Sequence, residues 1–325
     1  MKQIKRFALI LIALICTGTL YGAAAVYNGE EYSLKVNYND KIVPGDAVFV
    51  RMTFQYGKNL KKARSESEKS AILQLYKNKK LVDKSVFYSL NKPSKKSIPV
   101  DFLTGLPLSS WLDEGDYSLK VTFYLDESAK EFELPVYFEA REFHSETVEL
   151  DAANTAIKTN NSPERAAQID KLNTILETSI ATDIFNLKPF TSPTESTRYT
   201  AHFGDRRIYA YSNGKSSTSL HYGNDYGIPT GSEVRASGDG KVVMAENRIS
   251  TGWTVVIEHL PGLYSLYYHM DSLNAKEGDM VKQGELIGKS GSTGLSTGPH
   301  LHWEVRLNMC AVRPEFFMSN FTFCE

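Results

Sequence analysis

Apolar and polar residues alternate in short runs over residues 27–150. The runs are rich in β-branched and aromatic side chains, which is typical of strands with one buried face. We expect strands at Glu31–Val36, Ala47–Phe54, Ala71–Tyr76, Asp116–Tyr124 and Glu131–Phe138. Turn signals separate them at Pro44-Gly45, Asn91-Lys92-Pro93 and Glu114-Gly115. The pattern predicts an antiparallel, immunoglobulin-like β-sandwich over residues 26–150, although the Cys–Trp–Cys spacing of a true immunoglobulin domain is absent.

A helical period replaces the strand period after this segment. Ser162 is a good N-cap, Pro163 suits the first helical position, and Glu164 complements the helix dipole. One apolar stripe follows at helical spacing, formed by Ala166, Ile169, Leu172, Leu176 and Ile180. We expect a helix over residues 163–180 within a connector of residues 151–192. The segment Lys188–Pro193 then breaks the chain and opens the next domain.

Short β-rich runs and frequent glycines return in the last part of the chain. The runs are Gly240–Ala245, Thr254–His259, Tyr264–His269, Glu285–Gly288 and His300–Arg306. They predict a compact β-rich domain with many hairpins over residues 193–325. The whole chain is therefore expected to be all-β in the main, with two β domains joined by a short helical connector.

The first 25 residues read as a targeting segment. Lys2, Lys5 and Arg6 precede an apolar run from Phe7 to Cys16, and small residues follow at Gly22–Ala25. This order predicts a secretory signal peptide over residues 1–25, with no membrane span in the mature chain. A retained membrane anchor is the alternative. Lipidation at Cys16 would give a lipid-anchored form, but the bulky Ile15 before it fits that signal poorly.

The overall charge does not suggest a nucleic-acid-binding protein, and the cysteine usage fits export. The formal net charge of the 325 residues is −1, so no global basic field favours nucleic acid. The basic stretch Lys58–Arg64 reads as a solvated loop rather than a contact for an anionic polymer. Cys310 and Cys324 could form one disulfide in an oxidising compartment, or stay as two thiols.

Histidines and one aspartate in the last part of the chain have the spacing of metal ligands. His221 and Asp225 form H-x-x-x-D, and His300 and His302 form H-x-H in a β-rich run. Residues two apart on a strand point to the same face, so both rings could line one site. Three ligands chosen from these four would leave a fourth position for water, the pattern of a catalytic zinc. Each motif alone is also compatible with polar residues at a sheet edge.

Residues Phe190 to Pro314 resemble the lysostaphin-type (LytM-like) zinc metallopeptidases. The resemblance rests on an extended set of motifs: Phe203–Arg207 for the F-G-x-R opening, His221–Asp225 for H-x-G-x-D, Gly231–Val243 for a glycine-bounded hairpin, Tyr268-His269-Met270 for Y-x-H, Gly278–Gly284, Ile287-Gly288, Gly291–Gly294, and the run Ser296–Glu304 that contains H-x-H. It covers about 40% of the chain. Residues 26–150 have no part in it.

This resemblance implies a site, a cofactor and a reaction. It implies one Zn²⁺ per chain on His221, Asp225 and His302, with His269 and His300 as the catalytic histidines, while His202 and His259 are structural or surface residues. The implied reaction is hydrolysis of peptide bonds in peptidoglycan stems or cross-links by a zinc-activated water, in the periplasm or cell envelope. The alternatives are a non-catalytic activator of cell-wall amidases and a module with a structural zinc. Residues 26–150 could anchor the enzyme to the wall, cover the groove as a regulatory cap, or contact a protein regulator.

Overall fold

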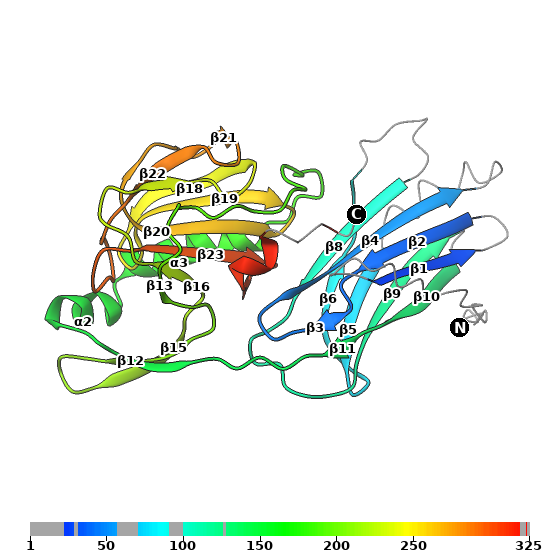
Figure 1. The fold of residues 1–325 in the computed structure, drawn as a ribbon, viewed down its shortest axis with the longest axis horizontal. Coiled ribbons are helices and arrows are strands. Elements are labelled where there is room, and N and C mark those ends of the chain that lie inside the picture. The colour runs from blue at the N-terminus through cyan, green and yellow to red at the C-terminus, as the bar shows by residue number, and fades with distance from the viewer. Residues whose placement is uncertain are drawn as a thin grey trace. The chain divides into compact units, whose positions relative to one another are not determined.

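The computed structural model describes residues 23–28, 32–56, 71–90, 100–125, 128–318 and 323. The described chain divides into two compact units (Figure 1). Unit 1 comprises the described residues up to Ala140 together with Phe323, and unit 2 begins at Arg141. The predicted division into four segments along the chain stays a prediction.

Unit 1 is built from two antiparallel sheets. The five-stranded sheet has the order β1-β2-β4-β8-β7, and its strands are β1 (Ala23–Asn28), β2 (Tyr32–Tyr38), β4 (Ala47–Tyr56), β8 (Val100–Pro107) and β7 (Tyr88–Ser89). The four-stranded sheet has the order β10-β9-β5-β6, with β10 (Ser128–Pro135), β9 (Tyr117–Leu125), β5 (Ile72–Lys77) and β6 (Lys80–Val86). A short parallel pair, β3 (Lys41–Ile42) and β11 (Tyr137–Phe138), completes the unit.

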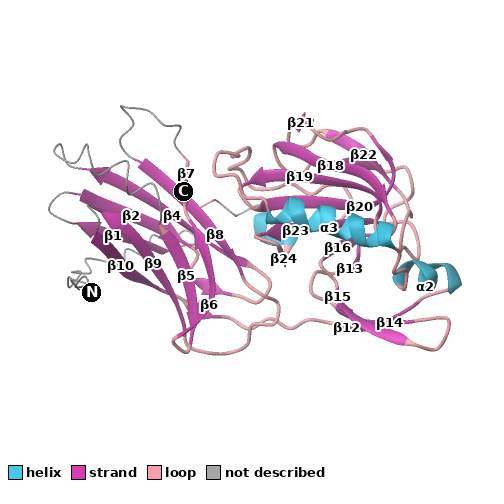
Figure 2. Cartoon of the chain, turned by 180° about the vertical axis from the view of Figure 1, so that it is seen from behind, coloured by secondary structure: helices cyan, strands magenta, loops and turns pink. Residues whose placement is uncertain are grey.

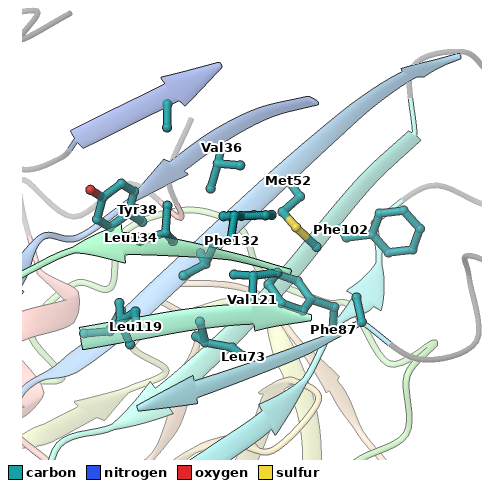
Figure 3. Packing of buried hydrophobic residues seen from close by; sticks show 14 of the residues in the cluster. Val36, Tyr38, Met52, Leu73, Phe87, Phe102, Leu119, Val121, Phe132 and Leu134 are labelled. Carbon is teal, nitrogen blue, oxygen red and sulfur yellow. The ribbon is translucent and has the colours of Figure 1, made fainter. Parts of the chain in front are cut away.

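The two sheets of unit 1 enclose one apolar core. Val36 and Met52 come from one sheet, Leu73 and Val121 from the other, and all four side chains are buried (Figure 3). Burial of apolar surface of this kind is the main favourable term in folding. The predicted β-sandwich is confirmed. The predicted run Glu131–Phe138 is divided between β10 and β11, because Pro135 has no N–H to continue a ladder.

Unit 2 begins with a strand and two helices. β12 (Ser145–Glu149) pairs in parallel with β14 (Arg206–Ala210), and β14 pairs with β15 (Ser216–Leu220). Between β12 and β14 lie the helices α2 (Ala152–Lys158) and α3 (Pro163–Glu177). Neither β12 nor α2 was predicted, since both segments are short, β12 is largely polar, and α2 is too brief to show a helical period.

A ten-stranded sheet forms the body of unit 2. Its main path is β13-β16-β23-β20-β19-β18-β21, while β17 pairs with β22, β22 also pairs with β20, and β24 pairs with β23. The strands are β13 (Tyr199–Ala201), β16 (Gly223–Tyr226), β17 (Glu233–Arg235), β18 (Gly240–Arg248), β19 (Gly252–Leu260), β20 (Leu263–Leu273), β21 (Met280–Val281), β22 (Leu286–Ser290), β23 (Leu301–Leu307) and β24 (Cys310–Val312), and a 3-10 turn, η1, follows at Pro314–Phe317. The predicted all-β class is confirmed.

Helix α3 lies across one face of this sheet (Figure 2). As predicted, the Ser162 side chain caps it by accepting a hydrogen bond from the backbone N–H of Arg165. Leu176 is buried against the sheet residues Met244 and Val256. The predicted length and stripe were partly wrong. The helix ends at Glu177, and Ile169 and Ile180 are exposed, because the buried face runs through Leu172, Ile175 and Leu176 instead.

Several predictions fall on residues outside the described ranges. They are the signal peptide up to residue 22, lipidation at Cys16, the basic stretch Lys58–Arg64, and a disulfide that involves Cys324. The last residues of the predicted signal, Ala23–Ala25, lie in β1 and pair with β2. Among the helices that the structure describes, none is both long and apolar enough to cross a membrane.

Candidate metal centre and its cavity

Strand register brings the predicted site residues together. In the β16–β23 pair Asp225 lies opposite His302, and in the β20–β23 pair Tyr268 lies opposite the same His302. β16, β23 and β20 are neighbours in the sheet (Figure 1). His221 lies just before β16, and His269 directly follows Tyr268. Residues far apart in sequence therefore converge at one end of three adjacent strands.

Three donor atoms form a small triangle in this place. Nε2 of His221 lies 3.1 Å from Oδ1 of Asp225 and 3.0 Å from Nδ1 of His302. Nδ1 of His302 lies 2.8 Å from the same carboxylate oxygen. All three residues are buried, and each contributes one ligand atom to a group that could hold a metal ion.

Hydrogen bonds fix the orientation of both imidazoles of the triangle. The Nδ1–H of His221 donates to the backbone carbonyl of His202 over 2.8 Å, so its Nε2 presents a lone pair to the site. The Nε2–H of His302 donates to Oε2 of Glu304 over 3.2 Å, so its Nδ1 faces the site. Tyr268 stacks on the His302 ring with 5.2 Å between the ring centroids. These contacts leave Nε2 of His221 and Nδ1 of His302 as the nitrogens that face the site.

The Asp225 carboxylate is held from its other side. Oδ2 of Asp225 accepts a hydrogen bond from Nη2 of Arg207 over 3.0 Å, and Nε of Arg207 donates to Glu146 over 2.6 Å. Glu146 comes from β12, the parallel neighbour of the strand that carries Arg207. The arrangement leaves Oδ1 of Asp225 directed at the imidazoles.

Charged neighbours decide whether the buried side chains of Asp225 and His302 are ionised. Burial alone would raise the pKa of Asp225, but His221 and His302 outweigh it and hold the pKa well below its usual range. Burial likewise disfavours the charged form of His302, yet the hydrogen bonds to Asp225 and Glu304 raise its pKa to about 9. In the metal-free site, His302 therefore keeps a proton at the place where a cation would bind. Binding of the cation would release this proton.

The donor set fits a zinc ion. A tetrahedral zinc with bonds of about 2.0–2.1 Å places its ligand atoms roughly 3.3 Å apart. The triangle edges of 2.8–3.1 Å are close to that spacing. Two neutral imidazole nitrogens and one carboxylate oxygen are ordinary zinc ligands, and three protein ligands are typical of a catalytic site.

Two further histidines present one nitrogen each beside the triangle. The Nδ1–H of His269 donates to the carbonyl of Thr293 over 2.8 Å, and the Nδ1–H of His300 donates to the carbonyl of Gly298 over 2.8 Å. Both Nε2 atoms stay available, and Nε2 of His300 lies 3.8 Å from Oδ1 of Asp225. The ring centroids of His269 and His300 are 4.7 Å apart. The pair can accept and donate protons at the edge of the metal group.

His269 has an unusual backbone and an unusual ionisation. Its φ of +60° lies in the left-handed region that residues other than glycine seldom adopt, as is frequent at functional sites. Burial, then the nearby His300 and His302, lowers its pKa to about 3. His269 is therefore neutral at physiological pH and can accept a proton.

Gly223 explains the glycine of the H-x-G-x-D motif. A Cβ at this position would lie 2.3 Å from the carbonyl oxygen of Trp303 and 2.9 Å from Nε2 of His302. Only a residue without a side chain allows β16 to approach β23 this closely, and that approach places Asp225 beside His302.

A cavity of about 710 Å³ lies over these side chains. His221, Asp225, His269, His300 and His302 all line it. Its other walls come from β12 and the end of α2, from the turn at Ser250-Thr251, and from the loop Leu295–Pro299. The volume is within the range of ligand sites in proteins.

The structure thus groups all five predicted site residues. His259 lies apart from them, buried and hydrogen-bonded to the Asp239 carbonyl and to Ser265. The sequence reasoning missed Glu304, Arg207 and Glu146. Glu304 was detectable, because it lies two residues after His302 on the same strand face. The contact between Arg207 and Glu146 spans 61 residues and depends on an unpredicted parallel strand pair.

Comparisons with known proteins find relatives of the segment that carries this site. Residues 219–314 match the profile described as Peptidase family M23. The chain is 46% identical over 95 residues to the DD-carboxypeptidase/endopeptidase Mpg of Neisseria meningitidis, covering 29% of this chain and 22% of Mpg. It is 39% identical over 108 residues to the peptidoglycan DD-endopeptidase ShyA of Vibrio cholerae, covering 33% of this chain and 24% of ShyA. The chain thus spans less than a quarter of the length of these relatives.

One solved structure resembles the chain over a longer stretch. It is a Pseudomonas aeruginosa protein described as an M23 peptidase, with a TM-score of 0.50 and 18% identity over 86% of this chain and 96% of that protein. At this identity the likeness concerns the fold alone. The 219–314 match agrees with the resemblance found in the motifs: this stretch of the C-terminal unit is similar to peptidase family M23.

Proposed function

We propose that this chain is an exported zinc endopeptidase that hydrolyses peptide bonds in peptidoglycan stems or cross-links. The observation that carries the proposal is the donor triangle of His221, Asp225 and His302 with the free Nε2 atoms of His269 and His300 beside it. The names of Mpg and ShyA, both peptidases, support the reaction class. The name of ShyA supports peptidoglycan as the substrate.

The protein's own residues would divide the work as follows. His221, Asp225 and His302 would hold one zinc, which when bound supplies a water with a pKa of about 7 and polarises a carbonyl group. His300 and His269 would receive the proton of the attacking water and deliver it to the leaving amine, a contribution of about 10²–10⁴-fold. Thr293 and Gly298, through their carbonyls, keep the Nε2 of each ring directed at the reacting atoms.

Positioning groups would keep this arrangement in place. Glu304 holds His302, the carbonyl of His202 holds His221, and Arg207 holds Asp225. Such contacts behind the ligands commonly change metal affinity about 10–100-fold when they are removed. The cavity walls would exclude bulk water from the bound peptide, which strengthens electrostatic interactions inside.

A digest of purified peptidoglycan tests the proposal. We expect the full-length mature protein, loaded with zinc, to release peptide fragments whose new amine ends are identified by mass spectrometry. The matched control is the His302→Ala variant, which should release none. No fragments from wild-type protein with about one zinc per chain would contradict the proposal.

A further inference from the structure

Residues upstream of the family match complete the cavity. The cavity is lined by the five site residues and by two upstream segments. These segments are Glu146–Leu150, which is β12 with the residue after it, and Lys158 at the end of α2. These upstream residues all precede residue 219, where the match to Peptidase family M23 begins. This wall can therefore give the chain a substrate preference that the matched stretch does not carry.

Lys158 is the cation of this wall that lacks an opposite charge. Its Nζ lies 4.0 Å from the ring centroid of Tyr209, and both residues line the cavity. Within the described part of the chain, no carboxylate forms an ion pair with Lys158, whereas Arg207 is paired with Glu146 and Asp225. A half-buried ammonium over an aromatic ring has lost part of its hydration. A bound anion would replace the stabilisation of the positive charge that water no longer provides.

The surroundings of Lys158 add positive charge. Burial, then the nearby Arg165 and Arg207, lowers the pKa of the Lys158 ammonium. Arg165 uses its donors on Ser250 Oγ and on the carbonyl of Asn160, which are neutral acceptors. Glu149, on the same wall, is exposed and lies outside ion-pair distance of Lys158 in the described structure. This corner of the cavity therefore favours an anion.

The position of Lys158 is fixed by the fold of unit 2. Asp151 caps α2 by accepting from the backbone N–H of Asn154 over 2.7 Å. The hydroxyl of Thr155 accepts from the backbone N–H of Ser212, in the turn between β14 and β15, over 3.0 Å. Helix α2 is thus tied to the strand that carries Tyr209. Lys158 is therefore already positioned beside Tyr209, and a ligand loses little binding free energy to ordering these side chains.

We propose that Lys158, supported by Tyr209, binds a free carboxylate of the peptide substrate and makes the enzyme select peptides that carry one near the scissile bond. This inference rests on the proposed peptidase function. The carboxylate has two chemical sources in such a peptide, its C-terminus and an acidic side chain. In either case the contact contributes to binding rather than to bond cleavage, so it acts on KM.

Kinetics on matched synthetic stem peptides test the proposal. Three peptides are compared: one with all carboxylates free, one amidated only at the C-terminus, and one amidated only at the side chain. We expect one of the amidated forms to raise KM about tenfold for the wild-type protein with little change in kcat. The amidation that has this effect identifies the carboxylate.

Variants at Lys158 complete the test. Lys158→Met should raise KM about tenfold for the free acid and leave KM for the responsive amide unchanged, while Lys158→Arg should retain most of the preference. The matched control is Lys171→Met, which removes a lysine of α3 that pairs with Glu246 and does not line the cavity. It should behave as wild type. Zinc content and melting temperature should be the same in all four proteins.

Two other results have distinct meanings. An equal rise in KM for all three peptides with Lys158→Met, or a wild-type protein indifferent to both amidations, would overturn the carboxylate subsite while leaving the peptidase function intact. If wild-type protein loaded with zinc cleaves neither these peptides nor peptidoglycan, the proposed function itself fails.

Discussion

Two places on the large sheet bury carboxylic acids and shift their pKa values in opposite directions. At the metal centre Asp225 and Glu304 are buried, and the cationic groups around them keep the pKa of each low. Further along the sheet Glu258 is also buried, opposite Tyr264. There burial, helped by the charge of Asp183, raises the pKa of Glu258 to about 7.

The contrast shows that burial does not by itself decide ionisation. Glu304 is held charged by Arg306 and His302 although burial opposes that state. His259, next to Glu258, has only neutral partners for its ring nitrogens, and burial lowers its pKa to about 4. Charge persists where opposite charges surround it, and a site that must attract a cation needs such a network.

The largest expected effect comes from removing a ring of the metal centre. His302→Ala removes a donor and should abolish both zinc binding and peptide hydrolysis. His300→Ala removes a group beside the triangle, so activity should fall about 10²–10⁴-fold while most zinc is kept. Elemental analysis and peptide kinetics on the two purified variants separate the roles. Equal loss of zinc in both would show that His300 is a ligand.

A smaller effect is expected from the cation behind the carboxylate. Arg207→Met leaves Asp225 buried without its arginine, so zinc affinity should fall about 10–100-fold, with a corresponding loss of activity at limiting zinc. Competition with a chelator measures the affinity. Glu146→Gln is the matched control, because Arg207 keeps its bond to Asp225, and its effect should be several-fold smaller. An Arg207→Met protein with unchanged affinity would show that His221 and His302 alone set the charge of Asp225.

The sequence pointed to the candidate ligands but not to the groups that hold them. His221, Asp225 and His302 stand in motifs whose spacing can be recognised, and the strand pattern of His300–Arg306 predicted β23. The partner strand β16 is short and fully buried, so it has no alternation and was not predicted. Glu146 stands in Ser145–Glu149, a polar segment without a clear alternation, and it reaches Arg207 only through a parallel pair of strands. Contacts between distant segments depend on topology, which no local pattern contains.

The fold, like the site, was predictable only where a local sequence pattern marks the element. Strands with one buried face, such as β2 and β5, alternate and were found. β8 was missed because nearly all of its residues are buried, so it has no alternation, and it contains Gly105 and Pro107. Helix α3 was predicted from its cap and first turn, but its buried face differs from the predicted apolar stripe. Packing against the sheet, and not the stripe alone, determines which face is buried.

The smallest expected effect concerns Glu258, the buried acid at which burial outweighs the charge of the nearby Lys241. The pKa of Glu258 is raised in the folded protein, so this carboxyl binds its proton more tightly when folded. The stability it contributes is complete below its ordinary pKa of about 4.5 and is lost as pH rises through about 7. Glu258→Gln mimics the protonated form at every pH. The difference in unfolding free energy, variant minus wild type, should therefore increase by about 2 kcal/mol when the pH rises from 5 to 8.

Urea unfolding of both proteins at the two pH values measures this difference. The comparison between proteins removes the contribution of His259, whose lowered pKa makes stability fall as pH drops from about 6.5 towards 4. A constant difference between variant and wild type would mean that Glu258 stays charged in the folded protein. The charge of Lys241, which lies opposite Glu258, would then be sufficient to keep a buried acid ionised.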